Sequence, residues 1–449
     1  MKYVYFIGIG GIGMSAIARY WKFKGYQVAG YDRTPSELTA RLESEGIPVH
    51  YEDCPDMLPP DKENTRVIFT PAVPESLGEL RKAKEEGYLL VKRSRALGEI
   101  TRGQHCLAVA GTHGKTTTST MLAHIITRHG GGCSAFLGGI SRNYGTNMLL
   151  SDSSTVVAEA DEFDRSFHQL HPEIAVITSV EPDHLDIYGD YGHVVEAFKV
   201  FASQVSGTLI AKKGTPLGPE DTPARFYTYH YTDTGADFYA ASQHADELGR
   251  IHYDLHYPGG VIRDFYAGTP GWINAENGLA AAAAAISFGV EPENVREAIS
   301  TFEGVKRRME VHYNVPGTVF IDDYAHHPAE LGSTISALRE IYPGRRITGI
   351  FQPHLYTRTR DFADEFAKVL STLDKLILLD IYPAREEPIP GVSSQMILDK
   401  VTAAEKVLVK KEELLDYLSR EPLDVLVSFG AGDIDRLVEP IAQMLKDRQ

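Results

Sequence analysis

The first hundred residues alternate short apolar runs with stretches of helical spacing. Runs rich in β-branched and aromatic residues at 4–10, 26–32 and 66–73 predict strands. Residues 14–25 and 36–46 carry apolar side chains at helical intervals, and the second stretch ends at a glycine suited to a helix C-terminus. This alternation is typical of a parallel sheet with right-handed crossover helices.

The same pattern starts again twice further along the chain. Apolar runs predict strands at 105–110, 154–161, 173–184, 317–328, 345–354, 375–384 and 424–432. Residues 274–289 predict a helix, whose six consecutive alanines indicate close packing and whose N-terminus we expect to be functional. Two turn-rich stretches, 215–223 and 256–260, predict loops. We therefore expect an α/β protein with domains at 1–99, 100–304 and 305–449.

Composition narrows the possible functions. A chain of 449 residues suits about three domains of roughly 150 residues each. The formal net charge of −16 argues against a nucleic-acid or membrane-surface binder, and no apolar run of about 18 residues predicts a membrane span. The N-terminal run fits a first strand better than a signal peptide. Cys54, Cys106 and Cys133 show no metal-binding spacing, so we expect reduced thiols in a cytoplasmic protein.

The first glycine-rich segment, GIGGIG, lies between a predicted strand and a predicted helix. It places Gly8, Gly10 and Gly13 at the fingerprint spacing of dinucleotide-binding enzymes, and Asp32 follows at the end of the next strand. Backbone N–H groups at such a helix N-terminus bind phosphate. The segment alone is therefore compatible with a nicotinamide-dependent dehydrogenase.

A second glycine-rich segment, AVAGTHGKTTTST, changes this interpretation. Gly111, Gly114 and the helix N-terminus behind them predict a cradle for ATP phosphates, although Val109 stands where the standard pattern has glycine. Lys115 is placed to neutralise the β- and γ-phosphates, and the Thr116 hydroxyl to hold Mg²⁺. The next predicted strand ends in carboxylates that predict a metal ligand, namely Glu159, Asp161 and Glu162.

Taken together, the motifs resemble those of the ATP-dependent Mur ligases, which build the cytoplasmic peptidoglycan precursor. GTHGKTTT, EADE, PDHLD, NAENGLAA, KRRME and DDYAHHP occur in the family's order and span the chain. GIGGIGMS, FQPHLYTRTRD and YPAREEPIPG resemble the branch that adds L-alanine to UDP-N-acetylmuramate. The resemblance implies a Rossmann-like UDP-sugar domain, a central P-loop ATPase-type α/β domain, and a C-terminal Rossmann-like domain for the amino acid and part of ATP.

The resemblance also implies roles for single residues. It assigns ATP binding to Gly111, Thr112, His113, Gly114, Lys115, Thr116, Thr117, Asn274, Asn277, Arg308 and Asp323. It assigns the UDP sugar and the amino acid to Gly10, Gly11, Ile12, Gly13, Asp32, Tyr324, His326 and Arg358. Two Mg²⁺ ions are expected on Thr116, Glu159 and His184, and the catalytic set is Lys115, Glu159, His184, Arg308 and His326. His326 is a candidate base for the amine, with water as the alternative.

This chain departs from the family pattern at a few positions. Ile273 replaces the usual histidine, Phe163 replaces the commoner serine, and Leu355 stands where many relatives carry an arginine. Arg358 and Arg360 are then the cationic candidates for the alanine carboxylate. Lys199 matches the position of a carbamylated, metal-bridging lysine in sister ligases, and the competing interpretation is an ordinary surface lysine.

The expected reaction is ATP-dependent amide formation through an acyl phosphate, with UDP-N-acetylmuramate and L-alanine as partners in a monomer or homodimer. The first glycine loop would then bind the UDP diphosphate, with Asp32 near the uridine end. Three alternatives remain. They are a recycling ligase that attaches a murein tripeptide to the same sugar, a nicotinamide-dependent dehydrogenase, and a nucleotide-regulated binding protein.

Overall fold

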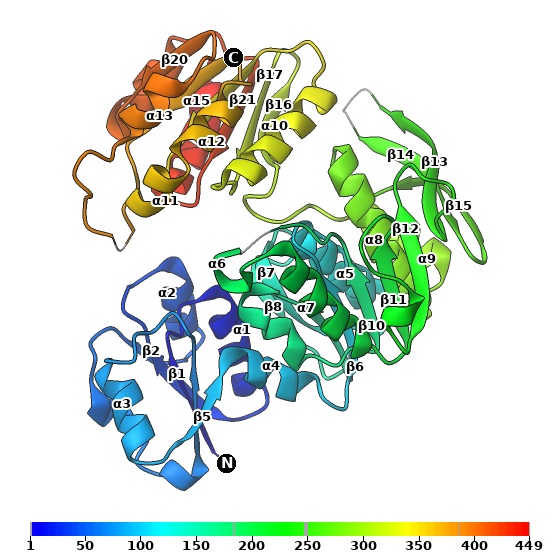
Figure 1. Ribbon diagram of the computed structural model, residues 1–449, viewed down its shortest axis with the longest axis vertical. Helices are drawn as coiled ribbons and strands as arrows, with labels where there is room; N and C mark the ends of the chain where they lie inside the picture. The colour runs from blue at the N-terminus through cyan, green and yellow to red at the C-terminus, as the bar shows by residue number, and fades with distance from the viewer. Residues whose placement is uncertain (1, 183–184, 247–249, 385, 449) are drawn as a thin grey trace. The chain divides into compact units, whose positions relative to one another are not determined.

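The computed structural model describes residues 2–182, 185–246, 250–384 and 386–448 (Figure 1). The chain forms two compact units. One comprises Met1–Pro270 with Asn274–Val305, and the other comprises Gly271–Ile273 with Lys306–Gln449. Among the described helices, none is long and apolar enough to cross a membrane.

The first unit begins with a parallel five-stranded sheet in the order β3-β2-β1-β4-β5. Its strands are β1 (Tyr3–Ile7), β2 (Gln27–Tyr31), β3 (Val49–His50), β4 (Thr65–Phe69) and β5 (Leu89–Lys92). Its helices are α1 (Ile12–Phe23), α2 (Glu37–Ser44), α3 (Gly78–Glu85) and α4 (Arg93–Thr101), with short 3₁₀ turns η1 (Pro55–Met57) and η2 (Lys62–Asn64). Alternation along β1 sends Val4 and Phe6 into one core and Tyr5 and Ile7 into another, so both faces are covered.

A ten-stranded sheet follows in the order β15-β14-β13-β12-β11-β10-β6-β9-β7-β8. Its strands are β6 (His105–Ala110), β7 (Ser134–Ser141), β8 (Thr146–Leu149), β9 (Thr155–Glu159), β10 (Ile174–Ile177), β11 (Thr208–Lys212), β12 (Arg225–His230), β13 (Phe238–Ala245), β14 (Ile251–Tyr257) and β15 (Gly260–Tyr266). The central strands are parallel, whereas β13–β15 and the β7–β8 pair are antiparallel. The helices are α5 (Lys115–His129), α6 (Leu185–Tyr188), α7 (Tyr191–Ser203), α8 (Trp272–Phe288) and α9 (Pro292–Ser300), with η3 (Phe163–Gln169) and η4 (Pro219–Asp221).

The alanine-rich helix α8 is packed as its sequence predicts. Ala280–Ala285 are all fully buried in the core that α8 shares with α5 and the sheet. At Gly278, an added Cβ would lie 2.4 Å from the Ala267 side chain. Small side chains therefore let the backbone of α8 approach its neighbours.

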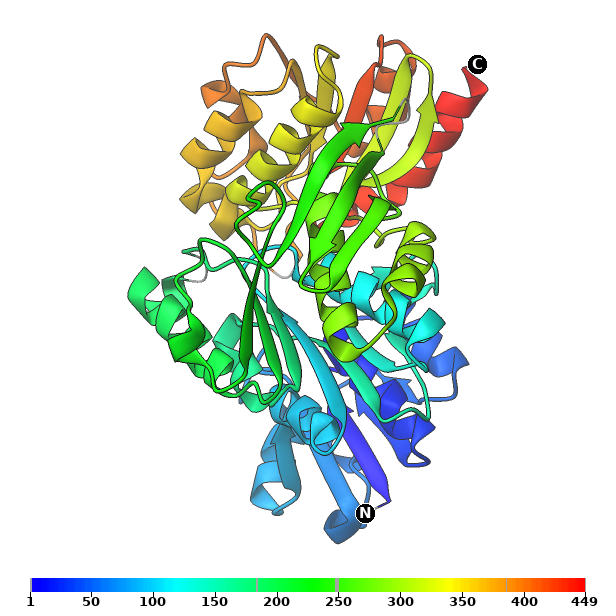
Figure 2. The same cartoon turned by 90° about the vertical axis from the view of Figure 1, so that its right-hand side faces the viewer.

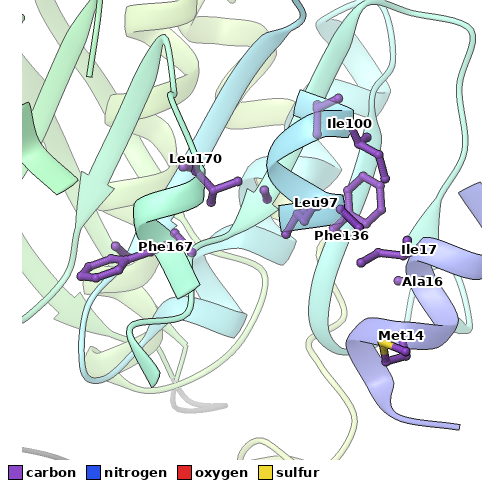
Figure 3. Close-up of a cluster of buried hydrophobic side chains, with 14 of the residues drawn as sticks. Met14, Ala16, Ile17, Leu97, Ile100, Phe136, Phe167 and Leu170 are labelled. Atoms are coloured by element: carbon purple, nitrogen blue, oxygen red, sulfur yellow. The ribbon is translucent and has the colours of Figure 1, made fainter. Parts of the chain in front are cut away.

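One hydrophobic core joins the two sheets of the first unit. Figure 3 shows side chains of α1 and α4 (Ile17, Leu97) beside Phe136 of β7 and Leu170. At Gly98 of α4, an added Cβ would lie 2.3 Å from the Gln169 carbonyl oxygen, so only glycine fits there without a shift. The N-terminal helices thus cover part of one face of the middle sheet.

The second unit contains a six-stranded sheet in the order β16-β17-β21-β18-β19-β20. Its strands are β16 (Glu310–Val315), β17 (Thr318–Asp323), β18 (Ile347–Phe351), β19 (Lys375–Leu378), β20 (Glu405–Leu408) and β21 (Val425–Phe429). Its helices are α10 (Pro328–Ile341), α11 (Tyr356–Asp361), α12 (Ala363–Leu370), α13 (Ser394–Lys400), α14 (Leu414–Ser419) and α15 (Val438–Asp447), with η5 (Lys411–Glu413) and η6 (Asp433–Leu437). Figure 2 shows the yellow and orange helices on one side of this sheet and the red α15 on the other, in agreement with two separate cores.

The predicted α/β class is confirmed, and the predicted strands and the 274–289 helix are present. Strands β3, β5, β7, β8, β11 to β16 and β20 were not predicted, and of these β7, β8 and β12 to β15 lie toward the edges of the middle sheet. The two turn-rich stretches do connect strands, the second as the β14–β15 hairpin turn. The domain limits stay predictions.

Phe136 tests the shared core. It is 5% exposed and packs with Tyr20 of α1 at a ring distance of 5.5 Å. We expect Phe136→Ala to lower the free energy of unfolding by about 3–5 kcal/mol, because a large buried ring leaves a cavity. Phe23→Ala, on the 40% exposed ring of the same helix, is the control and should cost far less. Equal losses in urea denaturation would contradict a joint core.

Candidate functional site

The first glycine loop is closed by a carboxylate. Gly8 adopts φ +86°, and the Gly10 N–H donates to Asp32 Oδ2 at 2.7 Å. An added Cβ at Gly10 would lie 2.8 Å from the same oxygen, which explains the glycine. Helix α1 then starts at Ile12 behind Gly11, with no side-chain cap and no acidic residue in its first turn. Its N-terminal N–H groups therefore suit an anion.

Arg93, which the sequence pattern did not predict as a site residue, lies beside this loop. An added Cβ at Gly13 would lie 3.0 Å from Arg93 Nη1, and Arg93 Nη2 is 3.5 Å from Asp161 Oδ2. Arg93 opens helix α4, where the helix dipole disfavours a cation. The N-termini of α1 and α4 and the Arg93 guanidinium thus lie together, and Asp161 at 3.5 Å is the carboxylate beside them. In the sequence, the pair Lys92–Arg93 directly after an apolar run could have indicated this cation.

The second glycine loop is held by the end of β10. Gly111 has φ +136°, and an added Cβ would lie 2.1 Å from Thr178 Oγ1. Ser179 Oγ accepts from the His113 N–H at 2.8 Å and lies 2.8 Å from the Thr112 hydroxyl. Thr178 and Ser179, which follow strand β10, were not predicted as site residues. Helix α5 begins at Lys115 directly behind Gly114.

Lys115 is anchored within the loop. Its Nζ donates to the Gly111 carbonyl oxygen at 2.6 Å and to Glu162 Oε1 at 2.9 Å, and the Glu162 side chain is only 1% exposed. Burial alone would lower the pKa of Lys115, but the carboxylates of Glu162 and Glu159 raise it above its ordinary value. The ammonium therefore stays charged and donates to the backbone of its own loop.

Glu159 and Thr116 each lie beside a glycine of strand β7. Glu159 Oε2 accepts from the Gly138 N–H at 3.0 Å, and an added Cβ at Gly138 would lie 2.3 Å from its other oxygen. At the next residue, Gly139, an added Cβ would lie 3.0 Å from the Thr116 methyl group. Glu159 and Thr116 thus each pack against one of two successive glycines of β7, and hard oxygen donors of their kind fit Mg²⁺. His184, the third predicted ligand, lies outside the described residues.

The second turn of α8 reaches the loop. Thr118 Oγ1 donates to Asn277 Oδ1 at 3.2 Å, and that oxygen would lie 2.8 Å from a Cβ at Gly114. Asn274 Nδ2 donates to the Pro270 carbonyl oxygen at 2.9 Å. Thr117 is half-buried in the first turn of α5. The structure thus brings Asn277 to the ATP-type loop, whereas Asn274 bonds its own segment.

Lys199 lies on α7 and pairs with Asp221 of η4, with 3.1 Å from Nζ to Oδ1. The hydrogen bond to Asp221 raises the pKa of Lys199, which disfavours the neutral amine that carbamylation requires. Its carbamylation stays a prediction.

In the second unit, Asp323 ends β17 in a buried position. Its carboxylate accepts from the Met309 N–H at 2.7 Å and the Ala325 N–H at 2.9 Å. Burial raises the pKa of Asp323 despite the opposing charge of Arg308. The Arg308 guanidinium lies over the Tyr324 ring at 5.7 Å. Asp323 therefore fixes the backbone that presents Arg308 and Tyr324.

His326 is prepared to accept a proton. Its Nδ1 lies 3.0 Å from the Tyr324 carbonyl oxygen, which assigns the proton to Nδ1 and leaves Nε2 as the acceptor. Burial lowers the pKa of His326, and the charges of Arg358 and Arg308 lower it further against the effect of Glu330. The imidazole is therefore neutral near pH 7.

Arg358 offers an unused donor. It lies on α11, and among the described residues its buried Nη1 has no hydrogen-bond partner. A buried guanidinium nitrogen without a partner is costly, so a carboxylate ligand there would be favoured. Leu355, at the residue before α11, has φ +74°. Arg360 is exposed and pairs with Asp361.

Comparison with known proteins places these sites in a family. Sequence models described as "Mur ligase family, catalytic domain", "Mur ligase middle domain" and "Mur ligase, glutamate ligase domain" match residues 3–105, 109–285 and 307–432. A UDP-N-acetylmuramate–L-alanine ligase of Parabacteroides distasonis is 53% identical, covering 98% of this chain and 97% of the relative.

Solved structures agree. The UDP-N-acetylmuramate-alanine ligase of Thermotoga maritima is 27% identical with a TM-score of 0.83, covering all of both chains. A murein peptide ligase of Psychrobacter arcticus, 21% identical with 99% of each chain covered, shares the fold at a TM-score of 0.70. On these matches and the two glycine loops, the chain belongs to the Mur ligase family.

Proposed function

We propose that this chain joins L-alanine to the lactoyl carboxylate of UDP-N-acetylmuramate, with ATP converted to ADP and phosphate, in peptidoglycan precursor synthesis. The observation that carries the proposal is the full-length similarity to a relative of that activity at 53% identity. The anchored Lys115, whose pKa is raised by the carboxylates of Glu162 and Glu159, supports ATP chemistry in the second loop. We expect the reaction to take place in the cytoplasm, in a monomer or homodimer.

The first loop is better assigned to the UDP diphosphate than to a nicotinamide dinucleotide. In a dinucleotide enzyme, the acidic residue after the second strand binds the ribose hydroxyls. Here Asp32 instead accepts from the Gly10 N–H and closes the loop. Arg93 adds a cation beside Gly13 that suits a diphosphate. A dehydrogenase would also leave the ATP-type loop at Gly111 without a role.

The recycling ligase that attaches a tripeptide is the second candidate, because a murein peptide ligase shares the fold. The L-alanine ligase of Thermotoga maritima is the better structural match, with a TM-score of 0.83 against 0.70. The binding of ATP in the second loop is common to both candidates, so the amino substrate alone separates them.

The residues suggest how the first chemical step is supported. A lactoyl carboxylate oxygen attacks the γ-phosphorus of ATP, the bond to the β-phosphate oxygen breaks, and an acyl phosphate and ADP form. The loop N–H groups and Lys115 bind the transferred group and spread its charge. Thr116 and Glu159, with His184 by resemblance, would hold Mg²⁺, which neutralises phosphate charge when bound.

The second step forms the amide. The neutral amine of L-alanine attacks the acyl carbon, phosphate leaves, and the amine loses a proton. His326 Nε2 accepts that proton, while the unpartnered Arg358 nitrogen binds the alanine carboxylate. Arg358 thereby substitutes for the arginine that Leu355 replaces.

Phosphate release tests the substrate assignment. We expect release from ATP to require both UDP-N-acetylmuramate and L-alanine, with weaker turnover of glycine and L-serine. Lys115→Met should lower kcat by about 10²–10³-fold, since the charge on the transferred phosphoryl group loses a fixed donor. Lys213→Met, which removes a lysine paired with Asp233 elsewhere, is the matched control. Turnover with the tripeptide and none with L-alanine would overturn the proposal.

The pH profile tests His326. Because its pKa is lowered, its neutral form persists below the ordinary histidine value of about 6.5, and kcat/KM should fall only at more acidic pH. His326→Gln should lower kcat by about 10²–10⁴-fold and remove this acidic limb. An unchanged acidic limb in His326→Gln would assign the proton transfer to water.

A further inference from the structure

Metal-ligating side chains gather at two places outside the proposed active site, among the described residues. One is Glu310, His312 and Asp322, and the other is His244, His252 and Asp264. In the first cluster the carboxylates already pair with Arg307. Its Nε donates to Asp322 at 2.9 Å, and its backbone N–H donates to Glu310. The second, on the antiparallel strands β13, β14 and β15, has no assigned role.

The three side chains of this second cluster come from three adjacent strands. His244 and His252 face each other across β13 and β14, with ring centroids 5.4 Å apart. Asp264 of β15 lies 2.8 Å from His252 Nδ1 through its Oδ1. One nitrogen or oxygen from each residue lies within 4.8 Å of the others. Small side-chain rotations therefore bring all three within the bond length of one ion, about 2.0–2.2 Å.

The backbone is bulged at this cluster in both outer strands. The register shifts between Ala241 and His244 on β13 and again beside Asp264 on β15. Ser242 and Asp264, the residues at these bulges, adopt φ +56° and +51°. Bulges redirect side chains out of the regular alternation. The bulges of β13 and β15 lie on either side of β14, and they turn His244 and Asp264 toward His252 of that strand.

Ring stacking is the competing role for these histidines. His252 also stacks on Tyr266 at 5.3 Å, so part of the cluster is an aromatic ladder. Stacking uses the ring faces, whereas the ring nitrogens direct their lone pairs or protons outward in the ring plane. Stacking therefore does not occupy the ring nitrogens. His244 Nδ1 lies 3.3 Å from the Ser242 carbonyl oxygen, which leaves His244 Nε2 as the ligand atom of that residue. Asp264, with a side chain 66% exposed, carries a charge that stacking does not need.

We propose that His244, His252 and Asp264 bind one divalent transition-metal ion of the Zn²⁺ class, with water in the fourth position. Two imidazoles and one carboxylate are a donor set that Zn²⁺ accepts, whereas Mg²⁺ prefers oxygen ligands throughout. Bound there, the ion cross-links β13, β14 and β15. Asp246, with Oδ2 3.8 Å from His252 Nε2, adds a nearby carboxylate that Arg250 already neutralises.

Zn²⁺ titration of the chelator-treated full-length protein, in excess Mg²⁺, tests the site. His252→Phe keeps a ring for stacking on Tyr266 but removes both ligand nitrogens. His256→Phe is the matched control, because His256 stacks on Tyr239 in the same strands and lies outside the cluster. We expect the wild type and His256→Phe each to bind one Zn²⁺ ion with similar affinity. His252→Phe should bind this ion at least tenfold more weakly, and Asp264→Asn should also bind it more weakly than the wild type.

Two further readouts come from the same proteins. Bound Co²⁺ should give the wild type a d–d absorption band typical of a Co²⁺ ion with low coordination number. His252→Phe should lack this band. Zn²⁺ should raise the Tm of wild type and of His256→Phe more than that of His252→Phe. Zn²⁺ binding of equal stoichiometry and affinity in wild type and His252→Phe would overturn the proposal, as would the absence of saturable binding to wild type.

Discussion

The packing of α1 and α4 against the middle sheet is the interaction on which the first unit depends. Each helix begins beside the first glycine loop, at Ile12 and Arg93, and each buries its apolar face in the core that contains Phe136 and Leu170. The second glycine loop ends β6 of that same middle sheet. One core therefore holds two glycine loops on separate sheets, and Arg93 beside the first loop lies 3.5 Å from Asp161, which follows β9 of the middle sheet.

Both glycine loops leave helix N–H groups open to an anion, but different side chains hold the two loops in place. Each relies on glycines where a Cβ would strike a neighbour. The first is closed by the carboxylate of Asp32, whereas the second is closed by the hydroxyls of Thr178 and Ser179 and contains its own lysine. The lysine and the nearby Glu159 make the second loop suited to phosphoryl transfer.

Local sequence pattern predicted the parallel α/β framework because each buried strand is a short apolar run and each crossover helix has helical spacing. The buried alanines of α8 followed the same logic. Strands β12 to β15 were missed because histidines, aspartates and other polar residues interrupt their apolar residues, so none of the four is a continuous apolar run. The family and the glycine loops could be predicted, whereas Arg93 and Ser179 act through contacts between segments distant in sequence. The roles of Asp323 and His326 stay predictions, although their burial and hydrogen bonds fit them.

In the proposed reaction, ATP activates the lactoyl carboxylate before the amine attacks. UDP-N-acetylmuramate labelled with ¹⁸O in its lactoyl carboxylate tests it most directly, because an acyl phosphate carries one carboxylate oxygen into the released phosphate. With ATP and L-alanine present, we expect one ¹⁸O atom in each phosphate formed and one retained in the amide. Release of phosphate free of ¹⁸O during amide formation would contradict it.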